Sequence, residues 1–176
     1  PLWFLKPDTS VVGHVATVTI APQAGRVIFE GELGVVIGAT CRNASLAEAE
    51  AAIFGYTCIN DLTSLDILNA DPAFAQWSRA KGFDGFGVIG PSIATGLDWR
   101  DLTIRTLVNG RERQSYPASD MIFSPAEIVQ HLSQDMTLMP GDVIAVGTSL
   151  GVRPVKAGDV VAVEIDGIGS AEVTLA

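Results

Sequence analysis

The chain has 176 residues and a net charge of −9 at pH 7, from 11 Lys and Arg against 20 Asp and Glu. This charge excludes nucleic acid as a partner and disfavours anionic membrane surfaces, because both are bound through basic side chains. Hydrophobic residues make up 48% and charged residues 18%, which excludes a disordered chain and provides for the core of one domain.

Short apolar runs rich in Val and Ile predict a strand-dominated fold, because 18 Gly and nine Pro residues separate them. A further strand-like run covers residues 56–59. The main strands are expected at residues 15–20, 27–37, 102–108, 143–146, 160–165 and 171–175.

Two helices are predicted from the residues that begin them. Ser45 and Glu48 form a capping box ahead of an Ala-rich run, which Gly55 is expected to end. Ser124 and Glu127, with a proline between them, form a second N-terminal signature, and apolar residues follow at helical spacing. The helices are few and short, so the sequence predicts a β-rich α+β fold.

No periodicity is visible between residues 61 and 86, where apolar and polar residues interleave. Irregular segments of this length are usually functional or disordered, and aromatic residues favour order here: Phe74, Trp77, Phe83 and Phe86. No linker or repeat divides the chain, so residues 1–176 are predicted to form a single domain.

Cys41 and Cys58 are the only cysteines, and both lie in apolar surroundings, so buried reduced thiols are expected. No apolar stretch approaches the length of a membrane span, and the first residues show no signal-peptide pattern. The expectation is a soluble, cytoplasmic protein. The chain begins at Pro1, which is consistent with a fragment or a processed chain.

The sharpest candidate for chemistry is the pair Glu30 and Glu32 in the predicted strand 27–37. Alternate residues of a strand point the same way, so both carboxylates are expected on one face of this apolar strand. Two such carboxylates repel each other and lose hydration, and a hard divalent cation would resolve both costs. The alternative is a face that is simply exposed to solvent.

Asp61 and Lys81 are further candidates, each with a structural alternative. Asp61 follows the strand-like run and could be a ligand, or it could cap the helix that follows. Lys81 lies among aromatic residues and glycines, where its ammonium could stabilise an enolate. It could instead lie over Trp77 or Phe83 at the surface. Asp66 is interpreted as structural.

The loop 146–151 follows a strand and offers backbone amides and hydroxyls, a plausible cradle for an anion. The two histidines, His14 and His131, have no Ser or Cys positioned for a nucleophilic triad. The sequence also lacks a dinucleotide-binding motif, a P-loop and a zinc-type cluster.

A set of stretches along the chain carries a family resemblance: residues 4–7, 30–33, 55–61, 81–84, 108–110, 120–123 and 140–148. In order and spacing, these stretches resemble the fumarylacetoacetate hydrolase superfamily over nearly the whole chain. The resemblance is to its small acylpyruvate hydrolase, oxaloacetate decarboxylase and 2-hydroxyhepta-2,4-diene-1,7-dioate isomerase type.

The resemblance implies a mixed β-roll or β-sandwich core with a few short helices, and members that usually form homodimers. It implies that Mg2+ or Mn2+ is held by Glu30, Glu32 and Asp61. Lys81 corresponds to the family's active-site lysine, and Thr148, beside Gly147, to a threonine that contacts the substrate. Members hydrolyse, decarboxylate or isomerise small 2-oxo acids.

The chain departs from the family pattern in two places. Leu65 and Leu68 stand where members often carry an Arg and a Gln that face the substrate. They are therefore expected to line a substrate pocket that is less suited to a second carboxylate. The His–Glu pair of hydrolytic members, upstream of residues 4–7, has no counterpart here. Either an N-terminal segment is missing, or the base comes from elsewhere, or hydrolysis is not the reaction.

The sequence therefore predicts a divalent-metal-dependent enzyme that acts on a small 2-oxo or 1,3-dicarbonyl acid. C–C bond hydrolysis through a metal-chelated enolate is the first reaction expected. Decarboxylation or enol–keto isomerisation on the same scaffold is the second. A third interpretation is a catalytically silent binding or partner subunit, which the two leucines favour and the acidic cluster opposes.

Overall fold

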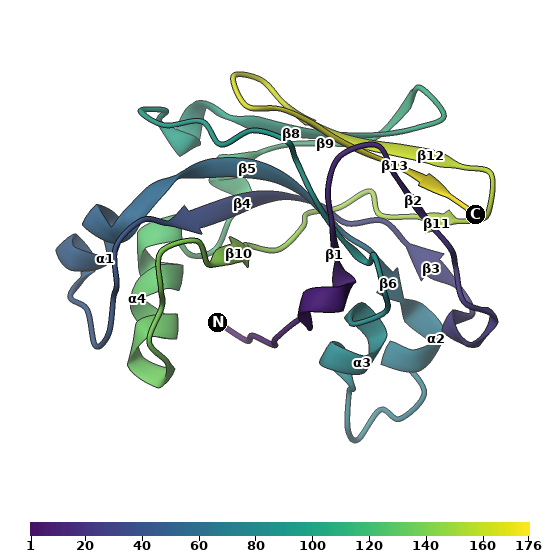
Figure 1. Ribbon diagram of the computed structural model, residues 1–176, viewed down its shortest axis with the longest axis horizontal. Coiled ribbons are helices and arrows are strands. Elements are labelled where there is room, and N and C mark those ends of the chain that lie inside the picture. Colours follow the sequence, from purple (N-terminus) through teal and green to yellow (C-terminus); the bar gives the residue numbers. More distant parts are fainter.

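Strands form the body of the molecule, as the computed structural model of residues 1–176 shows (Figure 1). One sheet has the order β1-β7-β5-β4-β10, with bounds Val11–Val12, Gly87–Ile89, Ile53–Asp61, Gly31–Ile37 and Val143–Ala145. A second has the order β2-β13-β12-β8-β9, with bounds Ala16–Val18, Gly169–Leu175, Val160–Ile165, Thr103–Val108 and Arg111–Pro117. A small third sheet has the order β11-β3-β6, with bounds Pro154–Val155, Val27–Ile28 and Thr63–Ser64.

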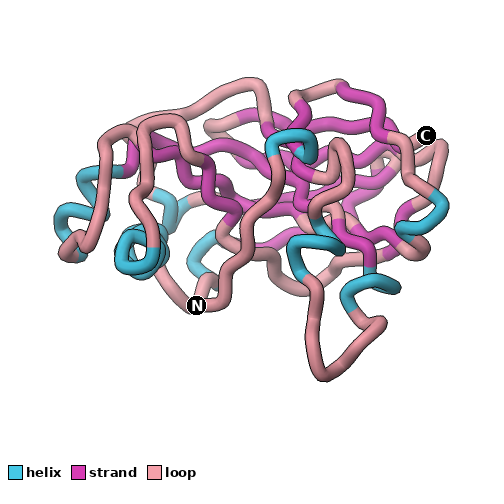
Figure 2. Tube along the Cα trace, turned by 60° about the horizontal axis from the view of Figure 1, so that its bottom comes forward, coloured by secondary structure: helices cyan, strands magenta, loops and turns pink.

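The four α-helices are short and lie around the margins of the strands (Figure 2). Their bounds are α1 Leu46–Ala52, α2 Leu65–Leu68, α3 Trp77–Lys81 and α4 Pro125–Asp135. α1 and α4 lie together at one end of the molecule, and α2 and α3 lie together near the third sheet (Figure 1). Parallel and antiparallel pairs occur in both large sheets. The β-rich α+β fold with few short helices is confirmed.

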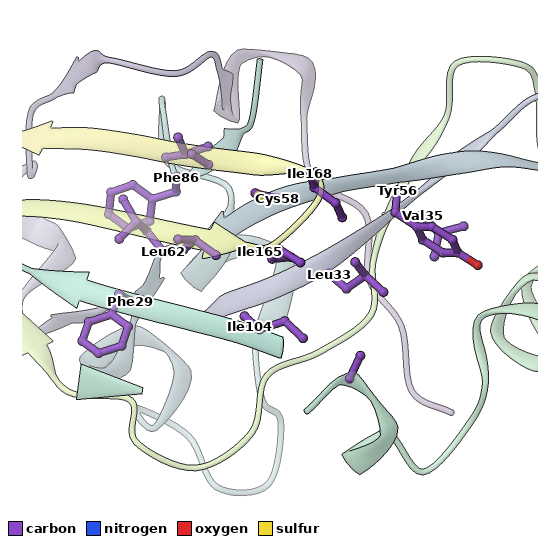
Figure 3. Close-up of a cluster of buried hydrophobic side chains, with 14 of the residues drawn as sticks. Phe29, Leu33, Val35, Tyr56, Cys58, Leu62, Phe86, Ile104, Ile165 and Ile168 are labelled. Carbon is purple, nitrogen blue, oxygen red and sulfur yellow. The ribbon is translucent and has the colours of Figure 1, made fainter. Parts of the chain in front are cut away.

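The two large sheets enclose the main hydrophobic core. Leu33 on β4, Ile104 on β8 and Ile165 on β12 are each at most 1% exposed and lie within one cluster of buried side chains (Figure 3). β4 is buried along its whole length because β5 and β10 flank it and the second sheet covers it. Such a strand shows no alternation of apolar and polar residues.

The predicted strand 27–37 is two strands in different sheets. β3 pairs with β6 and β11, whereas β4 pairs with β5 and β10. The strand is interrupted between them, at Phe29 and Glu30. Phe29 is fully buried, so its apolar character hid the break from a hydrophobicity pattern. As a result, Glu30 precedes the strand that carries Glu32.

Both predicted capping boxes are present, at Ser45 with Glu48 and at Ser124 with Glu127. The expected end of the first helix is wrong, because α1 stops at Ala52 and β5 begins at the next residue. The strand begins early because its residues pair with β4, and this long-range pairing replaces the helix.

Residues 61–86 contain three short elements, β6, α2 and α3. The rings of Phe83 and Phe86 pack together with centroids 5.0 Å apart, as an ordered segment requires. Phe74 is 71% exposed and contributes nothing to the core. The helix cap predicted at Asp61 is wrong, because the Ser64 side chain caps α2.

Cys41 and Cys58 are buried and free, as expected. Burial raises the pKa of the Cys58 thiol to about 12, so it is not a nucleophile at neutral pH. No helix of the structure combines the length and the apolar character that crossing a membrane requires.

Replacing Leu33 by Ala removes packed side-chain volume from the centre of the core. We expect a loss of about 2–5 kcal/mol in the free energy of unfolding, because a buried cavity remains. Denaturant unfolding followed by circular dichroism would measure it. Leu2→Ala is the matched control, since Leu2 is 96% exposed and should change stability little. Equal effects of the two changes would contradict the assigned core.

Candidate active site

Three carboxylates meet where β4 begins and β5 ends. Glu32 lies on β4, Glu30 directly precedes that strand, and Asp61 is the last residue of β5. The two segments are tied by a hydrogen bond from the Asp61 amide to the Glu30 carbonyl oxygen, at 2.9 Å. One oxygen from each carboxylate lies within 4.8 Å of the others. Glu32 and Asp61 are 2% exposed and Glu30 is partly buried, so the alternative of a solvent-exposed face for Glu30 and Glu32 is wrong.

Two lysines pair with the carboxylates. The Lys81 ammonium donates to the Asp61 carboxylate at 2.7 Å and to the Glu30 carboxylate. The Lys6 ammonium donates to the other Asp61 oxygen at 2.7 Å and also to the Lys81 carbonyl oxygen. Lys81 is 2% exposed, which excludes the alternative of a surface lysine lying over an aromatic ring.

The N-terminal stretch closes over this cluster. The Phe4 ring lies with its centroid 5.4 Å from the Lys81 nitrogen and stacks on the Trp77 ring at 5.9 Å. The role of Lys6 was missed in the sequence. The only sign of it was its place within the matching stretch 4–7, because local pattern carries no sign of a partner 55 residues away.

Glu32 is the carboxylate without a cationic partner. Its Oε2 accepts a hydrogen bond from the Gly147 amide at 2.7 Å. Burial, and then the Asp61 carboxylate, raise the pKa of Glu32 to about 8. Three carboxylates face two ammonium groups, so the fully ionised cluster carries one negative charge in excess.

The lysines differ in what surrounds them. Burial lowers the pKa of Lys81, but the carboxylates of Asp61, Glu30 and Glu32 outweigh it, and the net direction is upward. Burial prevails at Lys6, whose pKa is lowered. Burial also raises the pKa of Glu30, while Lys81 opposes the shift. Lys81 therefore keeps a positive charge at neutral pH.

The donor set of the cluster fits a divalent cation. Carboxylate oxygens are the ligands that Mg2+ and Mn2+ prefer, and Glu30, Glu32 and Asp61 offer three of them within reach of one ion. The excess negative charge and the unpaired Glu32 carboxylate provide the electrostatic reason for a cation.

The loop predicted as an anion cradle contacts the cluster directly. Gly147, at φ +97°, directs its amide to Glu32, so this donor already serves a carboxylate of the protein. The Thr148 hydroxyl donates to the Gly31 carbonyl oxygen at 2.9 Å. The loop therefore lies beside the site, as the resemblance implies.

Three further candidates from the sequence, Leu65, Asp66 and Leu68, all lie on α2. Leu65 and Leu68 are partly buried on α2, which begins four residues after Asp61. Their place in a substrate pocket stays a prediction. Asp66 binds the main chain and side chain of Arg26, which supports a structural role.

Neither histidine is part of the cluster. The His14 Nδ1 accepts a hydrogen bond from the Glu172 amide in the second sheet. The His131 ring packs edge-on against the Phe123 ring. Neither of these contacts pairs the imidazole with a Ser or Cys side chain, as a nucleophilic triad would require.

The whole chain, residues 1–176, matches the family described as fumarylacetoacetate (FAA) hydrolase C-terminal. The chain therefore belongs to this family, as the resemblance implied.

Curated relatives of the chain are longer than it is. An uncharacterized protein of Archaeoglobus fulgidus is 46% identical over 169 residues, which are 96% of this chain and 66% of that protein. A 4-hydroxyphenylacetate degradation bifunctional isomerase/decarboxylase of Salmonella dublin is 40% identical over 96% of this chain and 40% of its own length. A 2,4-didehydro-3-deoxy-L-rhamnonate hydrolase of Sphingomonas is 35% identical over 97% of this chain and 63% of its own.

Solved structures share the fold closely. A 2-hydroxyhepta-2,4-diene-1,7-dioate isomerase from Mycobacterium marinum has a TM-score of 0.93 and 44% identity, over 98% of this chain and 67% of that one. A fumarylpyruvate hydrolase from Pseudomonas aeruginosa, in complex with Mn2+ and pyruvate, has a TM-score of 0.92 and 31% identity, over 99% and 78%. The relatives that carry named activities are isomerases, hydrolases and a bifunctional isomerase/decarboxylase.

The raised pKa of Glu32 predicts a pH dependence for the stability of the metal-free protein. In the native state the Glu32 carboxyl group stays protonated up to about pH 8, whereas the ordinary pKa of this group is 4.5. The native state binds more protons between these values, so the stability that Glu32 contributes at low pH is lost as the pH rises through about 8. We expect the free energy of unfolding to fall less with rising pH in the Glu32→Gln variant, because the glutamine side chain cannot ionise.

Denaturant unfolding at about pH 5 and about pH 8, with chelator present, measures this difference. An equal fall in the free energy of unfolding for the wild-type protein and the variant would contradict the raised pKa of Glu32.

Proposed function

We propose that this protein is a divalent-metal-dependent enzyme that acts on a small 2-oxo acid. The observation that carries the proposal is the meeting of three buried carboxylates with a buried, positively charged lysine in one cluster. Family membership and the oxo-acid enzymes among the relatives support it. Mg2+ and Mn2+ are the proposed metals, and the Mn2+ in the related hydrolase structure supports the second.

A bound Mg2+ or Mn2+ would supply Lewis-acid polarisation of the carboxylate and keto oxygens of the substrate. Glu30, Glu32 and Asp61 would hold the ion. The Lys81 ammonium would donate a hydrogen bond to the enolate oxygen and place positive charge where negative charge develops. The Thr148 side chain, beside Gly147, would contact the substrate.

C–C bond hydrolysis of an acylpyruvate is the first reaction proposed, and decarboxylation or enol–keto isomerisation is the second. All three create an enolate, so the same charged groups serve each of them. Sequence identity favours the second candidate. The chain is 40% identical to the isomerase/decarboxylase and 44% identical to the isomerase, but 35% and 31% identical to the two hydrolases. Hydrolysis needs in addition a group that activates water.

A catalytically silent subunit is the alternative of another class. Burying three carboxylates at such close range costs stability, because each loses hydration and repels its neighbours. Groups with perturbed pKa values occur together at functional sites, where binding or catalysis requires them despite their effect on stability. The cluster therefore favours an enzyme.

Metal binding tests the proposal first. We expect saturable binding of Mg2+ and Mn2+ by calorimetry, and its loss in Glu32→Ala without unfolding of the chain. Asp66→Ala is the matched control, since Asp66 is an exposed carboxylate paired with Arg26. The reaction is then assigned from products: pyruvate from an acylpyruvate, CO2 from oxaloacetate, or an altered absorbance without release of either.

Turnover that Glu32→Ala leaves unchanged would refute the metal site. Metal binding without turnover on any 2-oxo acid would support the silent subunit instead.

A basic side chain at residue 65 should favour substrates with a second carboxylate. We expect Leu65→Arg to tighten binding of a 2-oxo dicarboxylate about tenfold relative to pyruvate, through a bidentate ion pair. Calorimetry on the metal-loaded protein measures both ligands. Ile67→Arg is the control, because Ile67 lies on the same helix and lines a surface cavity with Arg79 and Phe83. No difference between the two variants would mean that Leu65 faces elsewhere.

A homodimer and a cytoplasmic location complete the proposal. The homodimer rests on the family, and exposed apolar side chains such as Phe54 and Ile93 are compatible with an interface.

A further inference from the structure

Gln114 lies between the two large sheets, and its role was not visible in the sequence. It is on the edge strand β9, whose side chains are mostly exposed, yet Gln114 itself is 2% exposed. The strand Arg111–Pro117 was not predicted, because its residues are polar and five of the seven face solvent.

Every hydrogen-bonding position of the Gln114 amide is used. The Oε1 oxygen accepts from the Thr106 hydroxyl at 2.9 Å and from the Gly31 amide at 3.3 Å. The Nε2 group donates to the Thr148 hydroxyl oxygen at 2.7 Å and to the Ser149 carbonyl oxygen at 2.9 Å. A side-chain amide can do little more than make these four bonds, so Gln114 is fully committed.

One of these bonds reaches the backbone between two proposed metal ligands, at the Gly31 amide. Gly31 separates Glu30 from Glu32, and a Cβ at this position would lie 2.0 Å from the Thr106 hydroxyl oxygen. The glycine therefore lets the second sheet approach the backbone that carries both carboxylates. The Gly31 carbonyl oxygen is also held there, by the Tyr116 hydroxyl at 2.6 Å and the Thr148 hydroxyl at 2.9 Å.

The two bonds that Nε2 donates reach the loop that carries Gly147 and Thr148. Thr148 follows Gly147, whose amide donates to Glu32. Because the Gln114 amide donates to the Thr148 oxygen, the hydroxyl hydrogen is directed to the Gly31 carbonyl oxygen. Gln114 thus connects the loop and the carboxylate segment, which are more than 110 residues apart in the chain.

We propose that Gln114 is a positioning residue that fixes the spacing of the Glu30 and Glu32 carboxylates and holds the Gly147–Thr148 loop against them. This inference rests on the proposed function, because the carboxylates are taken as metal ligands and Thr148 as a substrate contact. Gln114 touches neither ion nor substrate and acts through Gly31 and Thr148.

The experiment is Mn2+ calorimetry on Gln114→Met, which keeps the length of the side chain and removes all four hydrogen bonds. We expect the dissociation constant for Mn2+ to rise about tenfold or more, as for other residues that orient metal ligands. Val129→Ala is the control for lost stability, since Val129 is fully buried on α4, a helix that packs against α1. Ser115→Ala is the control for the strand itself, since Ser115 is exposed beside Gln114.

Both controls should bind Mn2+ within about twofold of the wild type. Equal affinities in Gln114→Met and Val129→Ala would overturn the role of Gln114 and leave the proposed function intact. A wild-type protein that binds no Mn2+ would overturn the proposed metal site, and the inference with it. If Gln114→Met does not fold, Thr106→Val replaces it, because this isosteric change removes one of the two hydrogen bonds that the Gln114 oxygen accepts. It should still weaken Mn2+ binding more than Val129→Ala.

The loop is tested by a double-mutant cycle with Thr148→Val, using oxalate on the Mn2+-loaded protein. If Gln114 acts through Thr148, each single change weakens oxalate binding and the double change weakens it no further. Fully additive losses would overturn the connection through Thr148.

Discussion

The structure is organised around three carboxylates and two ammonium groups that share one buried cluster. Each charged group loses its hydration on burial, and only their mutual pairing offsets the loss. The pairing is incomplete, because the Glu32 carboxylate has a backbone amide and no lysine as its partner. The excess negative charge is the physical reason to propose a cation there. Burial is the main cause of the raised pKa values of Glu32 and Glu30, whereas the neighbouring carboxylates raise the pKa of Lys81 against the effect of burial.

The fold brings these groups together from four parts of the chain. Antiparallel pairing of β4 with β5 sets Glu32 close to Asp61, and the break before β4 lets Glu30 join them. α3 ends at Lys81, and the N-terminal stretch adds Lys6 across Asp61. The second sheet completes the arrangement by holding the Gly31 peptide. Strands thus carry Glu32 and Asp61, which suits a site whose geometry must be maintained.

Such a site suits a group of reactions rather than one. In the proposed function, the lysine and a cation held by the carboxylates would stabilise negative charge that develops at an oxygen, and hydrolysis, decarboxylation and isomerisation of a 2-oxo acid all develop it there. The family contains proteins named for each kind of chemistry. Groups outside the cluster, such as the residues of α2 that lie near Asp61 in sequence, would then select the substrate.

Local sequence by itself determined the α+β class, both capping boxes, the bounds of β12 and the residue types of the acidic cluster. Those features depend on hydrophobic period and on contacts within a few residues, which a sequence displays directly. Tertiary structure decided the break at Phe29 and Glu30, the end of α1, the strand around Gln114 and the pairing of Lys6 with Asp61. Each of these depends on a partner far along the chain. The free energy that such a partner contributes exceeds local preference and leaves no periodic mark in the sequence.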